Sequence, residues 1–386
     1  MRDVSIYSLN DLRRYVDAEN FGLLLNTANQ KYNRAVWRDY ADWGNPSDSR
    51  EWIQGQKETP ILVRASVLSA HGNKPQRATT GWKTYGGSIP KLGHGFSIDE
   101  SDLFELRKAS ALQGVPFGYL VTDSLIQNSS NMLGGIHNEI SRMLLQAMST
   151  GGINEVAIDG ASYDYKFPID KKNFVDVTSK WFEVGKDGVT LTAKEDADPV
   201  KDLKDAQKYI TDSLQLQVDH WTMSKTLFDA LLNHPAVLKR CFARADFRNT
   251  NSTTIKDLLL SDDEIMAVIH GLGIWPIDVI DFKTVHEENG QPVNDNIPFD
   301  VHNIVATNSL QKPFTIKCAN SIFKDRVAAG PTANSTLYSF VENRIGVLNT
   351  WQERPIENIV DFEVYAAPVF RDIHNIAFVK ACGDEA

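Results

Sequence analysis

The strongest constraint in the sequence is a long run of helical periodicity between Asp123 and Ser149. Apolar residues recur there at spacings of three and four, on one face: Met132, Ile136, Ile140, Met143, Leu144 and Ala147. Gly151 and Gly152 follow as a stop signal. Gly134 and Gly135 lie in the middle, where each costs about 1 kcal/mol relative to alanine. The pattern therefore predicts a long helix over about 124–150, with a bend at the glycines or a start at Asn131 or later as alternatives.

Shorter helices and strands mix irregularly around this segment. Asp198-Pro199 is a good helix start, and Ser261 to Glu264 form a capping box. Asp187-Gly188 and Glu288-Asn289-Gly290 are turn signals between strand-like runs. Residues 324–336 are loop-like. Because no βα unit repeats, the pattern favours an α+β fold over a doubly wound sheet.

The first 110 residues lack the apolar periodicity of an independent core. Residues 1–55 hold a possible helix from Leu9 to Ala18, and the tryptophans Trp37, Trp43 and Trp52 are scattered through turn-rich sequence. We interpret this stretch as an arm that packs on something else. Two extended segments, 61–70 and 88–106, flank a long turn region, and arms of about 15 residues would reach roughly 50 Å. An isolated ribbon is marginal in water, so it needs a neighbouring surface in its own chain or in another copy; an ordinary hairpin within a larger sheet is the alternative.

Composition excludes several classes. The chain has 386 residues and a net charge of −10, whereas nucleic-acid binders are usually basic. Apolar runs are too short for a transmembrane helix, and the N-terminus lacks a signal-peptide core. Cys241, Cys318 and Cys382 are too few and too far apart for a disulfide framework or a paired metal site. A reducing cytoplasm is the simplest compartment.

Motifs that carry chemistry are missing from the sequence. It contains no phosphate loop, no dinucleotide fingerprint, no zinc-protease helix and no nucleophile elbow. Cys241 with His234 or His220 could form a thiol–imidazole pair, but a small buried hydrophobe is the favoured interpretation. We therefore predict no catalytic, cofactor-binding or metal-binding residues and no cofactor.

The order of the segments carries more information than any motif. An N-terminal arm precedes an extended loop, and the helix SNMLGGIHNEISRMLLQAMSTGG is followed by a β segment around YDYKFPI. ADPVKDLKDA, WTMSKTLFDALLNHPAV, FDVHNIVATNS and the closing ENIVDFEVYAAPVF and HNIAFVKA follow. This order resembles the major capsid proteins of tailed bacteriophages with the Hong Kong 97 fold, and within them the lambda head-protein family.

The resemblance implies a division of the chain. It assigns an N-terminal arm to 1–56 and an extended loop to 57–110. A peripheral domain covers 111–222, contains the spine helix and is completed by 337–386. An axial domain covers 223–336.

The resemblance also implies a structural, non-enzymatic role in the virion. Copies assembled in the bacterial cytoplasm would form hexamers and pentamers of an icosahedral shell around double-stranded DNA, without sequence-specific binding and without a membrane. The implied partners are a separate scaffolding protein, or no scaffold at all, together with a portal and, as an option, a decoration protein. The expected contacts between subunits come from the arm and the loop: Trp37, Trp43, Trp52, Ile61, Val63, Val67, Arg77, Trp82, Ile89 and Phe96. Some members of the fold link subunits through a Lys–Asn isopeptide bond, for which Lys74, Lys83 and Lys91 are candidates. Nothing in the sequence identifies the asparagine that would react with any of them. An encapsulin shell and a soluble α+β enzyme remain alternatives.

Overall fold

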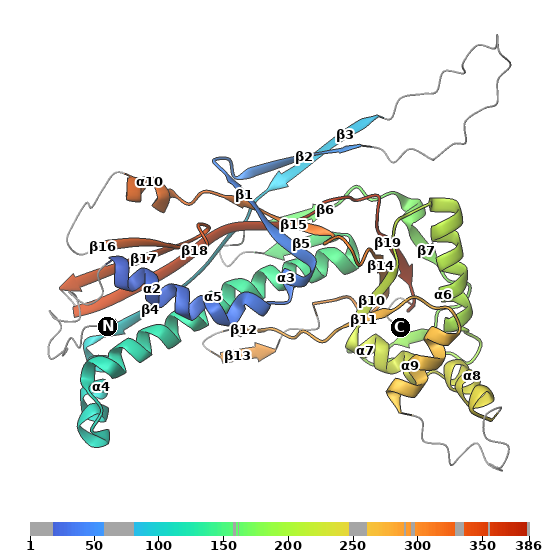
Figure 1. Ribbon diagram of the computed structural model, residues 1–386, viewed down its shortest axis with the longest axis horizontal. Helices are drawn as coiled ribbons and strands as arrows, with labels where there is room; N and C mark the ends of the chain where they lie inside the picture. Colours follow the sequence, from blue (N-terminus) through green and yellow to red (C-terminus); the bar gives the residue numbers. More distant parts are fainter. Residues whose placement is uncertain are drawn as a thin grey trace, which may run out of the picture. The chain divides into compact units, whose positions relative to one another are not determined.

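The computed structural model describes residues 18–57, 81–156, 160, 162–246, 261–288, 291–294, 298–328, 336–353 and 356–383. These residues form two compact units, each built from three separate stretches of chain (Figure 1). Unit 1 comprises the described parts of Met1–Trp52, Gly87–Leu144 and Phe314–Val369, and unit 2 those of Ile53–Gly86, Leu145–Pro313 and Phe370–Ala386. None of the helices in the described ranges is long and apolar enough to cross a membrane.

Unit 1 contains a six-stranded sheet and most of the longest helix. Its elements are α2 (Ala18–Asn29), η1 (Gln30–Arg34), α3 (Trp37–Tyr40), β1 (Ala41–Ser47), β4 (Lys91–Asp99), α4 (Glu100–Gln113), α5 (Phe117–Thr150, in this unit to Leu144), β15 (Phe314–Ala319), α10 (Ile322–Ala328), β16 (Thr336–Val341), β17 (Ile345–Glu353) and β18 (Ile356–Phe370). The strand order is β1-β15-β18-β17-β16, and β4 pairs antiparallel with β18. Helix α2 packs against β16.

Helix α5 confirms the long helix that periodicity predicts. It is continuous for 34 residues, and Ile136, Ile140 and Leu144 are buried on one face. The two central glycines allow close approach of other segments. A Cβ at Gly134 would lie 2.4 Å from the Tyr32 hydroxyl. A Cβ at Gly135 would lie 2.6 Å from the His94 ring, so a larger residue at either position would displace the neighbouring ring.

The N-terminal stretch is more ordered than the sequence predicts. Helix α2 buries Phe21, Leu25 and Ala28 at spacings of four and three, an apolar stripe that the prediction missed. Farther along, β1 pairs in parallel with β15, from Ala41 opposite Phe314 onward. Of the helix predicted at Leu9–Ala18, all but the last residue lies outside the described residues. The described part of the arm therefore packs on other segments of its own chain through α2 and β1.

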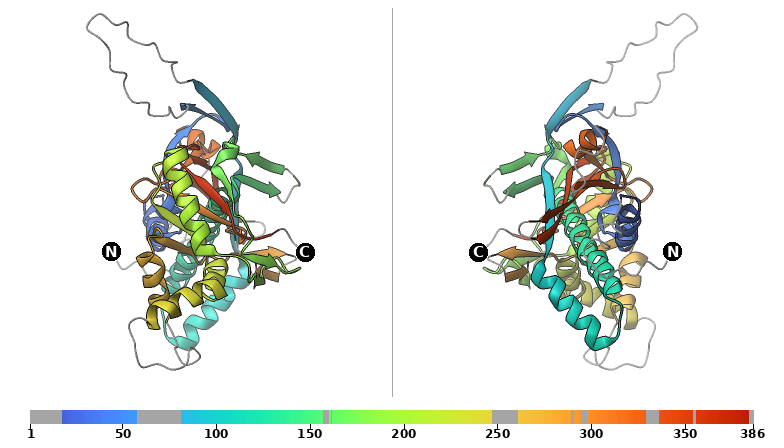
Figure 2. Two further views of the ribbon diagram at one scale, coloured as in Figure 1. Left: turned by 90° about the vertical axis from the view of Figure 1, so that its right-hand side faces the viewer. Right: turned by 90° about the vertical axis from the view of Figure 1, so that its left-hand side faces the viewer.

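The second extended segment of the predicted ribbon, residues 88–106, also differs from the prediction. Residues 91–99 form β4, which pairs along its whole length with β18 of the same chain. Residues 100–113, part of which was predicted to be extended, form helix α4. Asp99 begins this helix with a capping box, in which its side chain accepts from the Asp102 amide at 2.9 Å. Figure 2 shows α4 running from β4 to the start of α5.

Unit 2 is built on a five-stranded sheet of order β11-β10-β14-β19-β7. It also contains most of the two-stranded ribbon formed by β2 (Glu51–Lys57) and β3 (Trp82–Ser88); the first two residues of β2 and the last two of β3 belong to unit 1. The remaining elements of unit 2 are the end of α5, β5 (Gly152–Val156), β6 (Ser162–Lys166), η2 (Lys171–Asn173), β7 (Phe174–Asp176), β8 (Phe182–Val184), β9 (Leu191–Ala193), α6 (Pro199–Lys208), η3 (Tyr209–Leu214), β10 (His220–Ser224), α7 (Lys225–Leu232), α8 (Pro235–Asp246), α9 (Asp262–Gly271), β11 (Ile277–Ile280), β12 (Val285–Glu288), β13 (Gln291–Asn294), β14 (Asn303–Thr307) and β19 (Ala377–Lys380).

Local signals in unit 2 are confirmed where they are strongest. Asp198 caps α6, Ser261 caps α9 with a full capping box, and β8 pairs with β9 as the turn signal predicts. In unit 1, by contrast, α10 occupies the start of the segment predicted to be a loop over 324–336. The predicted limit between residues 222 and 223 falls inside β10, whereas the chain passes from unit 2 to unit 1 between Pro313 and Phe314. The α+β class is confirmed.

Candidate assembly surfaces

The base of the β2–β3 ribbon is bound to Phe370, the last residue of β18, and to Asp372 just after it. The Gln54 side-chain amide donates to the Phe370 carbonyl at 2.9 Å, and that of Gln56 donates to the Asp372 carboxylate at 2.7 Å. From the other strand, the Tyr85 hydroxyl donates to the Phe370 carbonyl at 3.3 Å. Burial raises the pKa of Tyr85, so this hydroxyl stays a donor at neutral pH. One face of the ribbon is thus held by polar contacts within unit 2.

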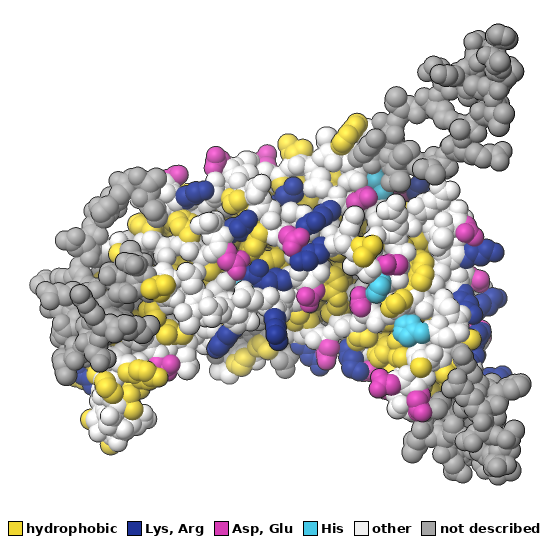
Figure 3. Space-filling view, viewed as in Figure 1, with side chains coloured by type: hydrophobic (Ala, Val, Ile, Leu, Met, Phe, Trp, Pro, Cys, Tyr) yellow, Lys and Arg dark blue, Asp and Glu magenta, His cyan; other side chains and the backbone are white. Residues whose placement is uncertain are grey.

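The opposite face of the ribbon exposes apolar side chains. Side chains alternate between the two faces of a strand, so Ile53 and Gly55 lie on the face away from Gln54. Ile53 is 75% exposed and Trp82 is 70% exposed. The Trp82 indole lies over Gly55, where a Cβ would be 3.6 Å from the ring. Figure 3 shows hydrophobic side chains at the surface of this ribbon.

In unit 1, a carboxylate at the tip of the β16–β17 hairpin binds the N-terminal segment. Three residues, 342–344, connect the paired Val341 and Ile345; Glu342 and Asn343 have positive φ (54° and 56°), and the Arg344 amide donates to the Val341 carbonyl at 3.1 Å across them, as in a type I′ turn. The Glu342 carboxylate accepts from the Asn29 amide at 2.7 Å, the Arg38 guanidinium at 2.6 Å and the Trp43 indole at 2.6 Å. Burial favours a higher pKa, but the Arg38 charge and these donors outweigh it and hold the pKa of Glu342 below its ordinary value.

A second polar cluster joins the same segment to α5. The Trp37 indole donates to Nδ1 of His137 at 3.1 Å, and Nε2 of His137 lies 3.0 Å from Oδ1 of Asn29. Because the indole can only donate, Nδ1 accepts and Nε2 carries the proton that Asn29 accepts. Burial, followed by the nearby Arg38 charge, lowers the pKa of His137 to about 4. His137 is therefore neutral at physiological pH.

The residues predicted to contact other subunits occupy different environments. Trp37, Trp52 and Ile89 are buried inside their own chain, at 1%, 6% and 4% exposed. Trp43 and Phe96 are half-buried, with Trp43 bonded to Glu342 and the Phe96 ring 6.4 Å from that of Phe362. Ile61, Val63, Val67 and Arg77 lie outside the described residues. Trp82 is the described residue of this set whose side chain is most available to a partner.

Sequence reasoning missed Glu342 and His137, which organise the N-terminal segment. The dipeptide Glu342-Asn343 between two strand-like runs is a weak turn signal, since glycine is absent. His137 lies on the predicted helix, yet nothing local distinguishes it from a solvated histidine. The candidate crosslinking residues are divided: Lys74 is outside the described residues, Lys83 is exposed, and Lys91 forms an ion pair with Glu363 at 2.5 Å.

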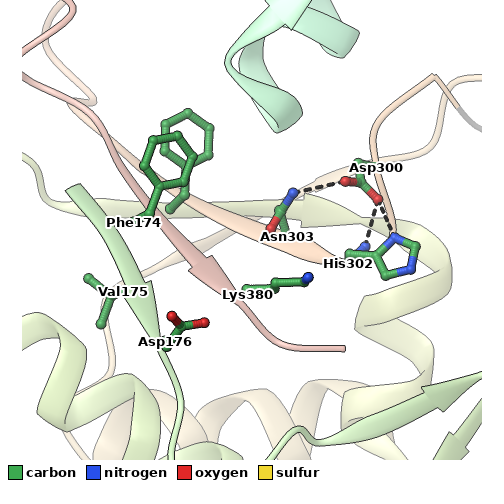
Figure 4. Close-up of a pocket in the computed structure, with 8 residues that line it drawn as sticks. Phe174, Val175, Asp176, Asp300, His302, Asn303 and Lys380 are labelled. Atoms are coloured by element: carbon green, nitrogen blue, oxygen red, sulfur yellow. Dashed lines mark hydrogen bonds and ion pairs between the residues drawn. The ribbon is translucent and has the colours of Figure 1, made fainter. Parts of the chain in front are cut away.

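A hollow of about 520 Å³ in unit 2 contains charged side chains but no catalytic arrangement (Figure 4). The Asp300 carboxylate lies 2.7 Å from Nδ1 of His302 and accepts a hydrogen bond from the Asn303 side-chain amide at 2.8 Å. Both partners follow Asp300 closely in the sequence. Lys380 and Asp176 line the hollow as well. No serine or cysteine nucleophile is among the residues that line this hollow. Within the described ranges, no group of three or more histidine, cysteine, aspartate or glutamate residues could hold a metal ion.

The thiol–imidazole alternative receives no support from the packing. Cys241 is 1% exposed and belongs to the hydrophobic core of unit 2. His234 accepts from the Ala236 amide through Nδ1 at 3.2 Å, and its ring packs edge-on against Phe182. These contacts account for both residues as parts of the core.

Comparisons with known proteins show the family of the chain and its fold. A family model described as phage major capsid protein E matches residues 52–274, more than half of the chain. The structure is similar to that of a prophage capsid protein from E. coli CFT073, with a TM-score of 0.52, 14% identity and coverage of 95% of this chain and 99% of that one. A phage-related protein from Bordetella bronchiseptica RB50 gives a TM-score of 0.48 and 12% identity, with 94% and 98% covered. The capsid of Myoviridae phage XM1 gives 0.40 and 10%, with 89% and 90% covered. No curated protein sequence matches the chain.

Proposed function

The chain belongs to the phage major capsid protein E family, and from this premise we propose that its copies assemble as hexamers and pentamers of an icosahedral shell that encloses double-stranded DNA. Membership of the family makes the protein a structural component of the virion, with the capsid fold, whose copies associate into shells. The encapsulin and enzyme alternatives draw no support from the comparisons. A net charge of −10 fits a shell that surrounds DNA without gripping it.

The exposed apolar face of the β2–β3 ribbon carries the proposal. An isolated ribbon gains little stability from its own two strands, and here one face is already bound to residues 370–372. The other face presents Ile53 and Trp82 to solvent, an arrangement typical of a surface that a partner covers. Tryptophan is also enriched among residues that dominate interface energies. We assign this face to a neighbouring copy of the chain.

The test replaces Trp82 with alanine and compares it with Thr84→Ala, an exposed position on the same face of β3. Trp82→Ala is expected to leave the subunit folded, with the melting temperature within about 2 °C of wild type, and to reduce the yield of closed shells in electron microscopy at least tenfold. Thr84→Ala should assemble like wild type. Normal shells from Trp82→Ala would show that this face of the ribbon does not contact a neighbouring copy of the chain.

Further partners follow from the same proposal. A separate scaffolding protein would guide assembly, and a portal and a decoration protein would complete the head. Co-purification of closed particles with DNA supports the shell proposal. Particles that hold protein cargo and no DNA would favour the encapsulin alternative.

A further inference from the structure

Strand β4 has a free hydrogen-bonding edge. The Ala366 amide donates to the Pro90 carbonyl at 3.2 Å, and this bond sets the alternation of the antiparallel pair β4–β18. The even-numbered residues of β4 therefore exchange hydrogen bonds with β18, and the N–H and C=O groups of the odd-numbered residues point away from it. Among the described residues, β18 is the only strand that pairs with β4, which borders the sheet of unit 1 (Figure 2). The outward groups belong to residues that are all exposed: Lys91, Gly93, Gly95 and Ser97.

The start of α4 marks one end of this edge. The Asp99 amide also points outward, and it donates to the Asp102 carboxylate at 3.1 Å. Before it the register with β18 runs without a bulge, and the strand contains no proline. Among the charges, prolines and bulges that usually protect an edge strand, only the charge of Lys91 is present, and it is paired with Glu363 at 2.5 Å. The edge is therefore open to an extended backbone, whose N–H and C=O groups match its own.

The face of β4 that is turned to α5 is only partly covered. The His94 ring lies against α5 on this face. Val360 and Phe362 of β18 are 0% and 1% exposed there, whereas their partners on β4, Phe96 and His94, are half-buried and exposed. Leu92, on the same face, is half-buried as well. The apolar cover is thus complete over β18 and incomplete over β4, where one more strand would extend it.

We propose that β4 pairs antiparallel with β4 of a second copy of the chain, about a two-fold axis at His94. This inference rests on the proposed shell function, because it is the shell that brings copies together. In this register Gly93 lies opposite Gly95 of the other copy, and Lys91 lies opposite Ser97. Each of these pairs exchanges its outward N–H and C=O groups. A single contact satisfies the free edges of both copies, as an isologous interface does.

The side chains on both faces fit this register. On the face turned to α5, Leu92 lies directly opposite Phe96 of the other copy, and the axis repeats this apolar pair. Registers displaced by two residues would bring His94 opposite Phe96 or Leu92 instead. On the other face the glycine pairs let the strands approach, and Lys91 has Asp99 of the other copy next along the strand. Opposite charges are therefore neighbours, which is the complementarity that favours a specific contact.

Disulfide trapping in purified shells tests the position of the axis. His94→Cys places a thiol at the non-hydrogen-bonded pair on the axis, where the Cα atoms are about 4.5 Å apart, within the range of a disulfide. It is expected to give mostly disulfide-linked dimers after mild oxidation. The matched control is Ser97→Cys, exposed on the same strand; its two copies lie roughly 20 Å apart and should stay monomeric on a non-reducing gel. The three native cysteines are buried and give a low background.

Hydrogen exchange of the wild-type protein tests the edge without any substitution. The outward amides of Gly93, Gly95 and Ser97 should exchange rapidly in the unassembled subunit and at least tenfold more slowly in shells. The inward amides of His94 and Phe96 bond to β18 in both states, so their slow exchange is the internal control. Mass spectrometry with fragmentation of the labelled peptides distinguishes alternate residues.

The outcomes separate the two proposals. If wild type forms no shells, alone or with a scaffold, the proposed function fails, and the pairing of β4 fails with it. Shells that form normally but leave the outward amides unprotected, or give no His94→Cys dimer, overturn the pairing alone. Protection of these amides in the unassembled subunit would show that the chain covers its own edge, and it would also overturn the pairing. A Ser97→Cys dimer as abundant as the His94→Cys dimer would contradict the axis at His94.

Discussion

The Trp37 indole donates a hydrogen bond to Nδ1 of His137 at 3.1 Å, although the two residues are 100 positions apart in the sequence. Both side chains are almost completely buried, at 1% and 0% exposed. This hydrogen bond fixes the tautomer of His137 and joins the N-terminal segment to the longest helix of the subunit.

Trp37→Phe is expected to destabilise the unassembled subunit by about 1–3 kcal/mol, because it leaves a buried acceptor on His137 without its donor. Chemical denaturation measures this change. Trp82→Phe, at an exposed indole, serves as the control and should fall within about 0.5 kcal/mol of wild type. Equal effects of the two substitutions would contradict the role assigned to the Trp37 bond.

Acid should weaken the subunit through His137 before it protonates carboxylates. The folded-state pKa of about 4 lies below the ordinary 6.5, so between these values the unfolded chain binds more protons than the folded one. Stability therefore falls as the pH drops from 6.5 toward 4, by about 3 kcal/mol in total. In His137→Gln the loss over this range should be smaller, as measured by denaturation at several pH values. A slope unchanged by the substitution would place the acid sensitivity elsewhere.

Glu342 should set the strength with which the N-terminal segment is held. Glu342→Gln removes the charge that pairs with Arg38 and turns one acceptor atom into a donor. We expect faster hydrogen exchange of the amides in α2 and α3, with α5 unchanged. Glu342→Asp keeps the charge on a shorter side chain and is expected to have a smaller effect. Because the carboxylate is ionised in the fold with a lowered pKa, its contribution is lost as the pH falls through that pKa. Equal exchange rates in wild type and Glu342→Gln would contradict this role.

A double-mutant cycle tests why α5 carries a glycine at position 134. Gly134→Ala would gain about 1 kcal/mol from helix propensity in open space, but its Cβ would clash with the Tyr32 hydroxyl. We expect a net loss of about 1–3 kcal/mol in the wild-type background. In the Tyr32→Ala background the same change should become neutral or stabilising. Additive effects, with a coupling energy near zero, would show that the two residues do not meet.

The elements predicted best are those whose information is local. Asp198 and Ser261 begin helices, and each cap involves residues at most three positions apart in the sequence. The buried face of α5 can be recognised from the spacing of its own apolar residues. The place of the arm depends instead on Glu342 and His137, which are distant in sequence and polar, so hydrophobic periodicity does not reveal them. Residues 100–106, the first half of α4, were predicted to be extended because the exposed Phe104 obscures the amphipathic pattern, although the capping pair Asp99 and Asp102 could have marked the start of the helix.

The parallel pairing of β1 with β15 constrains the timing of biosynthesis. Residues 41–47 leave the ribosome some 270 residues before their partners at 314–319, which at about 5–20 residues per second is a wait of roughly 14–54 s. Until then β1 has an unsatisfied edge, and the sheet of unit 1 also lacks β16, β17 and β18, which come later still. A nascent chain cannot present the finished unit 1 while it is being translated. Only released, completed polypeptides therefore contain the whole sheet of unit 1, and translation products that end before residue 314 lack β15, β16, β17 and β18.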